Sequence, residues 1–513
     1  MNKAKYDGRE HPVRQVTDLK DIIVSSCSMF KDDTAFLEKD KPGGTFQPIS
    51  YAKVKDDVDA LGTKLMDMGL KGSKIAVVGE TSYHWFLTYF ATVCGVGVIV
   101  PLDKNLPQDE LKSLIERSHA KAIVFSKRME KTIKPLFDEP GEIEYFISMS
   151  ESENEKVLSL EHLIEEGNKL LGEGVRDFVD AEINPEEMAS LLFTSGTTGR
   201  SKGVMLSHKN IASNVVNVSK RVTLDKGCVV LSILPVHHTY ENTIDWVTIY
   251  QGRTIAVCEG IKYILKNMNE VKANCMVGVP LVFEKIFKGL MKQAEGRGEG
   301  EKVRNAIALS RRLKLYNNRS LIRKLFKPVH QAFGGGMQLF IAGGAAMDPE
   351  ITESFEAMGI PMIQGYGMTE YAPIIAVNQD NYSIARSVGR PMPETLVRID
   401  NADENGIGEI VVKGPSVMLG YYEDQEATDE VIEDGWLHTG DLGYLDSNDF
   451  LYLTGRKKTV IVTKGGKNIF PEEIEAVLKE NELIKETIVH GVTDNTVGNV
   501  IVTADIQPNY EHV

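Results

Sequence analysis

A segment rich in hydroxyl groups and glycine, residues 194–203, combines residue types that bind a polyphosphate. It reads Thr-Ser-Gly-Thr-Thr-Gly-Arg-Ser-Lys-Gly and follows a short apolar run at 191–193. Glycines let backbone N–H groups approach an anion, successive N–H groups form a concave anion nest, and hydroxyls add uncharged donors. Lys202 adds a compact positive charge. The candidate phosphate ligands are Thr194, Ser195, Gly196, Thr197, Thr198, Gly199 and Lys202.

This segment differs from a Walker loop, which requires G-x-x-x-x-G-K-[ST] leading directly into a helix. Here Gly196 and Gly199 are too close together, and residues 203–206 have the pattern of a second strand. We therefore expect a strand–loop–strand hairpin that covers phosphates. An ordinary Gly/Thr turn is the alternative, and the density of hydroxyls makes it the less favoured one.

Two further motifs could complete a nucleotide site. After the strand-like run 362–364 come Gly365, Tyr366, Thr369 and Glu370, which offer a ring to stack on a base, a phosphate donor and a magnesium ligand at the carboxyl end of a strand. Asp441 follows a Thr-Gly turn and can accept hydrogen bonds from both ribose hydroxyls, with the cation of Arg456 nearby. Each motif alone could be a structural turn; together with the phosphate segment they favour nucleotide binding.

Two other segments follow predicted strands. Gly343, Gly344 and Ala345 are small enough to let the backbone approach a ligand, although a tight turn explains them equally well when they are taken alone. His237 and His238 are adjacent, and neighbouring side chains diverge, which argues against a metal-binding pair.

Taken in order, these motifs resemble the adenylate-forming superfamily, which holds acyl-CoA synthetases, peptide-synthetase adenylation domains and firefly luciferase. The resemblance rests on Thr-Ser-Gly-Thr-Thr-Gly-x-x-Lys-Gly, Gly-Tyr-Gly-Met-Thr-Glu and Gly-Trp-x-x-Thr-Gly-Asp followed by Gly-Arg, over residues 191–475. Ser201 replaces the usual proline before the lysine. The pattern Leu-Pro-x-x-His-x-x-Glu at 234–241 is similar to that of long-chain fatty acid CoA ligases.

The resemblance implies a reaction. A fatty carboxylate attacks the α-phosphate of ATP, pyrophosphate leaves, and a thiol, expected to be that of coenzyme A, takes the acyl group. It implies that Tyr366 lies against adenine, Thr369 contacts the α-phosphate, Glu370 and Thr194 bind Mg²⁺, and His238 lies beside the carboxylate. It also places Gly343, Gly344 and Ala345 near adenosine and the acyl carboxyl end, and it gives Glu241 no defined role. The alternatives are a carrier-protein phosphopantetheine as acceptor, a nucleotide-binding module without full catalysis, and a luciferase-like oxygenase.

Alternation of strand-like and helix-like segments predicts an α/β fold of layered, mostly parallel sheets covered by helices. The acidic stretch 151–187 reads as largely helical, and 387–453 as a β-rich subdomain. We expect a large AMP-binding domain at 1–454 and a small α+β domain at 455–513. The resemblance implies that the small domain is mobile and that Lys458 is its hinge; a surface lysine in a basic loop is the alternative. The family's Pro-x-x-x-x-Gly-Lys segment, whose lysine bridges carboxylate and α-phosphate, is not found before Val513, so we expect the small domain to be incomplete and the natural chain to continue.

Composition limits the partners. A net charge of −15 argues against nucleic acid. Five cysteines without a C-x-x-C pair favour a reducing compartment, and the absence of a signal peptide or spanning segment favours the cytoplasm. One basic run is either a solvated helix face or a contact for an acidic membrane surface or an anionic cofactor tail; it contains Arg311, Arg312, Lys314, Arg319, Arg323, Lys324 and Lys327. A homodimer is one open option for the quaternary state.

Overall fold

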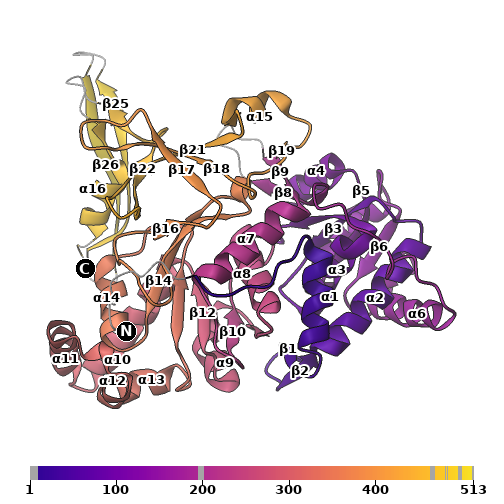
Figure 1. Ribbon diagram of the computed structural model, residues 1–513, viewed down its shortest axis with the longest axis horizontal. Helices are drawn as coiled ribbons and strands as arrows, with labels where there is room; N and C mark the ends of the chain where they lie inside the picture. The colour runs from indigo at the N-terminus through magenta and orange to yellow at the C-terminus, as the bar shows by residue number, and fades with distance from the viewer. Residues whose placement is uncertain are drawn as a thin grey trace.

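The computed structural model describes residues 10–194, 201–462, 468–479, 481, 483–494 and 499–510. Within these residues, two large sheets and a smaller one account for most strands, and helices fill the space between the two large sheets (Figure 1). Both large sheets consist mainly of parallel strands with antiparallel strands at their edges. The expected α/β class is confirmed.

The first sheet has the strand order β19-β9-β8-β4-β3-β5-β6-β7. In that order its strands are Gly420–Tyr421, Lys202–Ser207, Met188–Thr194, Gly97–Leu102, Ser73–Val78, Ala120–Phe125, Tyr145–Ser148 and Val157–Ser159. The second sheet has the order β16-β15-β14-β13-β12-β10-β11-β1-β2. In that order its strands are Arg390–Pro391, Ile374–Val377, Met362–Gly367, Leu339–Ala342, Cys275–Gly278, Val229–Ser232, Thr254–Val257, Thr34–Lys39 and Phe46–Ser50.

Helices cover both faces, and capping residues fix where several of them begin. Ser50 accepts a hydrogen bond from the Lys53 N–H at the start of α2, and Ser207 forms a reciprocal capping box with Asn210 at the start of α7. The helices of the first 300 residues are α1 Leu19–Met29, α2 Tyr51–Asp67, α3 Tyr83–Ala91, α4 Gln108–Ser118, α5 Glu130–Ile133, α6 Leu160–Gly172, α7 His208–Arg221, α8 Thr239–Tyr250, α9 Ile264–Val271 and α10 Pro280–Gly296. The later ones are α11 Gly300–Leu313, α12 Arg319–Leu325, α13 Lys327–Ala332, α14 Pro349–Ala357, α15 Gln425–Val431 and α16 Pro471–Lys479. No helix in the described part of the chain is long and apolar enough to cross a membrane.

The stretch 151–187 was expected to be largely helical, and this expectation is wrong for most of it. Only α6 is an α-helix there; residues 173–187 form turns and extended chain. Two local features explain the difference. Gly174 has a φ of +93°, and the residue before Pro185 is restricted away from helical geometry.

The stretch 387–453 is rich in strands, as expected, although β21 is ten residues long and helix α15 interrupts the strands. Strands β17, β18, β21, β20 and β22 form the smaller sheet; they are Leu396–Asp400, Gly408–Lys413, Trp436–Leu445, Ile432–Glu433 and Leu451–Arg456. Beyond it lie the pair β23 Ile461–Val462 and β24 Asn468–Ile469, then α16, then the pair β25 Ile484–Asp494 and β26 Asn499–Pro508. The expected domain boundary at 455 falls inside β22, so the two-domain division stays a prediction.

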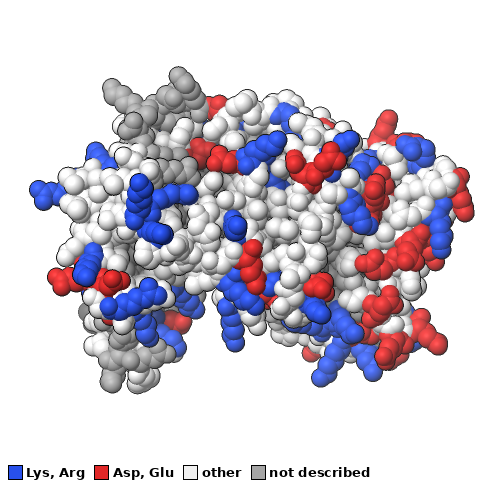
Figure 2. Space-filling model, turned by 90° about the horizontal axis from the view of Figure 1, so that it is seen from below, with Lys and Arg blue, Asp and Glu red and all other residues white. Residues whose placement is uncertain are grey.

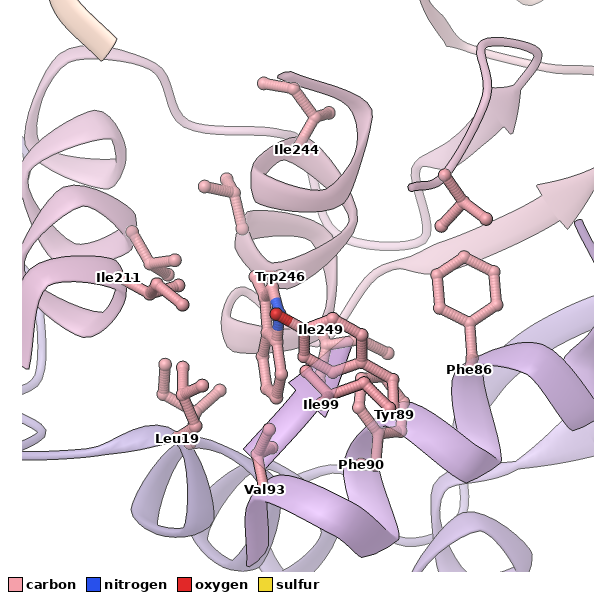
Figure 3. Packing of buried hydrophobic residues seen from close by; sticks show 14 of the residues in the cluster. Leu19, Phe86, Tyr89, Phe90, Val93, Ile99, Ile211, Ile244, Trp246 and Ile249 are labelled. Carbon is pink, nitrogen blue, oxygen red and sulfur yellow. The ribbon is translucent and has the colours of Figure 1, made fainter. Parts of the chain in front are cut away.

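Helix α8 lies at the centre of the core. Trp246 is 1% exposed, and its ring centroid lies 4.9 Å from that of Phe90 and 5.9 Å from that of Tyr89, both on α3 (Figure 3). Helix α8 also packs on α1 and α7, so it joins the N-terminal helices to the second sheet. The residues that begin α8 are therefore held by a rigid element.

We expect Trp246→Ala to lower the free energy of unfolding by about 3–5 kcal/mol, because the surrounding rings cannot fill the resulting cavity. Urea denaturation measures this change. Trp436→Ala is the control, since Trp436 is only half-buried and its ring lies 4.5 Å from the Arg398 guanidinium; its loss should cost less than about 1 kcal/mol. Equal losses in the two variants would contradict the central position of α8.

Candidate active site

The phosphate segment is a β-hairpin at one edge of the first sheet. Strands β8 and β9 are antiparallel, and Thr194 pairs with Lys202 in their register. The Thr194 hydroxyl donates to the Lys202 carbonyl at 3.4 Å. The predicted strand–loop–strand arrangement is confirmed. The predicted ligands Ser195, Gly196, Thr197, Thr198 and Gly199 lie outside the described residues.

A tyrosine that the sequence analysis missed joins the phosphate hairpin to the Thr-Glu motif. The Lys202 ammonium lies 4.7 Å from the centroid of the Tyr421 ring. The Tyr421 hydroxyl donates to Oε1 of Glu370 at 2.9 Å, and its pKa is raised by burial and by the Glu370 charge. Strand β19 pairs with β9, which brings Tyr421 beside the hairpin. A signal was present in the sequence, since Tyr421 and Tyr422 are two adjacent aromatics directly after a glycine.

Thr369 and Glu370 form one short 3₁₀ turn, 369–371, directly after β14. The Glu370 carbonyl accepts from the Met418 N–H at 2.9 Å, which fixes the turn against the chain leading to Tyr421. The Thr369 hydroxyl lies 3.4 Å from the hydroxyl of Thr239, the first residue of α8. The turn therefore lies between the phosphate hairpin and the start of α8.

A second cluster joins Tyr366, Asp441 and Arg456. The Tyr366 hydroxyl donates to Oδ2 of Asp441 at 2.7 Å, and Nε of Arg456 lies 3.0 Å from Oδ1. Burial raises the pKa of the Asp441 carboxyl, while its two partners act against that rise. Gly440, with φ at +70°, makes the turn that presents Asp441. A carboxylate has about four acceptor positions, so Asp441 retains capacity for further donors such as ribose hydroxyls.

The expectation that His237 and His238 diverge is wrong. Their ring centroids lie 4.2 Å apart, because the two residues lie in the turn before α8, whereas alternation of side chains holds for a strand. Burial and the neighbouring His238 lower the pKa of His237 to about 4, and burial also lowers the pKa of His238. Both imidazoles are therefore neutral near pH 7.

An apolar cavity lies between α7, α8 and the second sheet. Its lining includes Val218, Tyr240, Val247, Ile341 and Gly365. At one end, the Tyr240 hydroxyl donates to the Ile341 carbonyl at 3.3 Å. A side chain in place of Gly343 would come within 2.7 Å of the Tyr240 ring, so this glycine is required by the close approach of α8. Gly344 and Ala345 follow in the same loop after β13.

The donor set near Glu370 suits magnesium. Among the described residues, no group of three or more His, Cys, Asp or Glu side chains could hold a metal ion. Mg²⁺ uses few protein oxygens and completes its shell with phosphates and water. Glu370 is linked to Lys202 of the hairpin through Tyr421, and Thr194 pairs with Lys202, so these two oxygen donors could bind an ion that arrives together with a polyphosphate.

The remaining predicted residue, Lys458, lies in the turn after β22, two positions beyond Arg456. Lys457, between them, forms an ion pair with the largely buried Glu409 at 2.8 Å. The segment 464–468 resembles the part of the family's small domain that faces the thiol acceptor. Residues 464–467 lie outside the described residues, and Asn468 begins β24.

Comparisons with known proteins give a family match, sequence relatives and similar solved structures. A family model described as AMP-binding enzyme matches residues 24–422. The chain is 27% identical over 473 residues to the long-chain-fatty-acid–CoA ligase FadD15 of Mycobacterium bovis, covering 89% of this chain and 78% of that protein. It is 24% identical over 555 residues to the long-chain-fatty-acid–[acyl-carrier-protein] ligase AEE15 of Arabidopsis thaliana, covering 94% and 76%. The crystal structure of ATP-bound MatB from Rhodopseudomonas palustris matches with a TM-score of 0.73 at 25% identity, covering 96% and 89%.

Proposed function

The chain belongs to the AMP-binding enzyme family, and from this premise we propose that it activates a long-chain fatty acid with ATP and transfers the acyl group to coenzyme A. In the first step the carboxylate oxygen bonds to the α-phosphorus while the bond to the bridging oxygen breaks, and pyrophosphate leaves. In the second step the thiolate of coenzyme A attacks the acyl carbon and AMP leaves. Protein groups position the reactants and neutralise charge, so no protein nucleophile is required.

One observation carries the nucleotide part of the proposal. Tyr421 contacts Lys202 through its ring and Glu370 through its hydroxyl. Lys202 belongs to the first sheet, whereas Glu370 follows β14 of the second sheet. In the proposed complex Lys202 neutralises the phosphates, Thr369 donates to the α-phosphate, and Tyr366, Asp441 and Arg456 hold the adenosine. Mg²⁺ bound by Glu370 and Thr194 would neutralise the phosphate oxygens.

The acyl part rests on α8. His238 and Thr239 begin this helix beside Thr369, and the apolar cavity follows along Tyr240 and Val247. We assign the carboxylate of the substrate to the start of α8, beside His238. The cavity along this helix has a volume of about 20 Å³, so its apolar lining would have to move apart to admit a hydrocarbon chain. The neutral imidazole of His238 would donate a hydrogen bond to the carboxylate without pairing with its charge. The long-chain specificity is supported by the names of the relatives.

The acceptor has one serious alternative. The relative from Arabidopsis is named as a ligase for acyl carrier protein, and a carrier-protein phosphopantetheine ends in the same thiol as coenzyme A. The proposed hinge at Lys458, where the small domain 455–513 would turn between the two steps, serves either acceptor.

Exchange of labelled pyrophosphate into ATP, run with fatty acids of increasing chain length, tests the proposal. We expect exchange that depends on fatty acid and on Mg²⁺, followed by thioester formation when coenzyme A is added. No fatty-acid-dependent exchange by the full natural gene product would contradict the activity. Exchange with loading of a carrier protein, but no CoA thioester, would favour the alternative acceptor.

For the partner surface, we propose that the face carrying α11 and α12 contacts an acidic membrane surface. Four leucines on these helices are exposed, namely Leu309, Leu313, Leu321 and Leu325. Exposed basic residues interleave with them, namely Arg312, Lys314, Lys324 and Lys327. In Figure 2 the left part of the molecule, where α11 and α12 lie in Figure 1, shows more Lys and Arg than Asp and Glu. Asp and Glu are more frequent in the right part. Arg311 of the predicted basic run is already neutralised by Glu350 and Glu353 of α14.

Reversing the charge of Arg312, Lys314 and Lys324 to Glu is expected to weaken binding to vesicles that contain anionic lipid by at least about 10²-fold, since the loss of each basic residue near such a surface costs about 1 kcal/mol and the new carboxylates are repelled. Cosedimentation measures the binding. The matched control reverses three exposed lysines on the far side of the first sheet, Lys127, Lys131 and Lys134. Wild-type protein that does not bind these vesicles, or a control that loses binding equally, would contradict this surface. The cytoplasm remains the predicted location.

A further inference from the structure

We infer that Glu241 is a positioning residue: its buried carboxylate ties the connection between β10 and α8 to the helix, and so holds His238 at the acyl end of the active site. This inference rests on the proposed function and adds a role to it. Glu241 is 1% exposed and lies in the first turn of α8. Its Oε1 accepts a hydrogen bond from the Ile233 N–H at 3.0 Å.

The connection that Glu241 holds carries the acyl-site residues. Strand β10 ends at Ser232, and α8 begins at Thr239, so residues 233–238 form the connection, with His237 and His238 at its end. Glu241 fixes the beginning of this connection to the helix turn that follows it. The first residue of the connection is thereby hydrogen-bonded to the helix that follows the connection. A capping box makes a similar contact over a shorter stretch of chain.

The same helix turn contacts both neighbouring motifs. Thr239 lies against Thr369, and Tyr240 donates to Ile341 and packs against Gly343. Because Thr239, Tyr240 and Glu241 lie in one helix turn, a displacement of the 233–238 connection would move His238 relative to Thr369. Adenylation requires the carboxylate and the α-phosphorus in near contact, and a misplacement of about 1 Å costs about 10²-fold in rate.

Stability alone does not account for a carboxyl at this position. Burial raises the pKa of Glu241 to about 7, although Ser232, Ile233 and Leu234 at the end of β10 act to lower it. A buried ionisable group is costly, and an apolar side chain of similar size would be as stable or more so. The hydrogen bond to Ile233 therefore contributes to geometry more than to folding.

Asp245 provides an internal control. It lies one helical turn after Glu241, is equally buried at 2% exposed, and its pKa is raised by burial and by the Glu241 charge. Within the described residues its Oδ2 has no hydrogen-bond partner, and the same holds for Oε2 of Glu241. Asp245 thus matches Glu241 in burial, charge type and helix, and differs in lacking the contact with Ile233.

The experiment compares Glu241→Gln, which keeps an acceptor oxygen for Ile233, with Glu241→Met, which keeps the volume and removes the acceptor. We expect Glu241→Met to lower kcat/KM for fatty acid in pyrophosphate exchange by about 10- to 100-fold, with the KM for ATP changed less than about threefold and the melting temperature unchanged or higher. Glu241→Gln, Asp245→Asn and Asp245→Leu should each remain within about threefold of wild type.

Three results would overturn the inference while leaving the proposed function in place. They are an active Glu241→Met, an inactive Glu241→Gln that is folded, and losses in the Asp245 variants as large as those in Glu241→Met. Wild-type protein without fatty-acid-dependent exchange would instead remove the proposed function, and the positioning role with it.

Discussion

Replacing Glu370 with Gln is expected to lower the rate of fatty-acid-dependent pyrophosphate exchange by about 10³-fold. The carboxylate lies between the phosphate hairpin and α8, and it accepts from the Tyr421 hydroxyl at 2.9 Å. Gln keeps the size and an acceptor oxygen, so the hydrogen bond and the local fold persist. What is lost is the negative charge that holds Mg²⁺ against the phosphates, and electrostatic groups of this kind contribute about 10²- to 10³-fold or more in rate.

Two control variants separate the charge from the scaffold around it. Tyr421→Phe removes the hydroxyl but keeps the ring beside the Lys202 ammonium, so a loss of about tenfold is expected from a less well oriented Glu370. Glu433→Gln removes an exposed carboxylate and should have no effect. An exchange rate of Glu370→Gln within tenfold of wild type would show that Glu370 does not hold the ion. The same conclusion would follow if high Mg²⁺ raised the exchange rate by the same factor in Glu370→Gln, Tyr421→Phe and Glu433→Gln.

Local features of the fold were predictable because their causes are local. The caps at Ser50 and Ser207, the hairpin of β8 and β9, and the strand that carries Tyr366 all follow from residues within a few positions of one another. The cause of the wrong prediction for 173–187 is also local. Gly174 and Pro185 are both visible in the sequence, and their effect on the backbone outweighs the helical composition.

Features that depend on distant pairing were not predictable from one sequence. Tyr421 reaches Lys202 because β19 pairs with β9, and no motif spacing encodes that pairing. Arg311 reads as part of a continuous basic run, yet Glu350 and Glu353 of a later helix neutralise it. Even the recognised motifs do not predict which of their side-chain atoms form contacts with one another.

The divergence expected of His237 and His238 failed for a different reason. The alternation rule was applied to residues that lie past the end of β10, in a turn where successive side chains can point the same way. The position of Glu241 became interpretable only with the structure, because the group that donates to its Oε1 is the backbone N–H of Ile233. Sequence patterns indicate side-chain chemistry well, and contacts to backbone groups poorly.

Replacing Asp441 with Asn is expected to raise the KM for ATP by about 10²-fold without loss of stability. Oδ2 accepts from Tyr366 and Oδ1 faces Arg456, and the proposed adenosine site needs the remaining acceptor positions of the carboxylate. Asn offers one acceptor oxygen in place of two and carries no charge. Hydrogen bonds to a charged group contribute about 1.5–3 kcal/mol each, which corresponds to one to two powers of ten in affinity.

The pKa shift of Asp441 makes the outcome of this variant decisive. Burial raises the pKa of the carboxyl above its unfolded value, so between those two pKa values the folded state binds more protons than the unfolded state. The contribution of the Asp441 carboxyl to the free energy of unfolding is therefore present at acid pH and declines as the pH rises through that window. At pH 7 this contribution is unfavourable. Asn removes this penalty, and thermal unfolding without nucleotide should give an equal or higher melting temperature. The stabilisation of wild type by added ATP should largely disappear in the variant. A lower melting temperature combined with an unchanged KM for ATP would show that Asp441 supports the β21–β22 pair and does not bind the nucleotide.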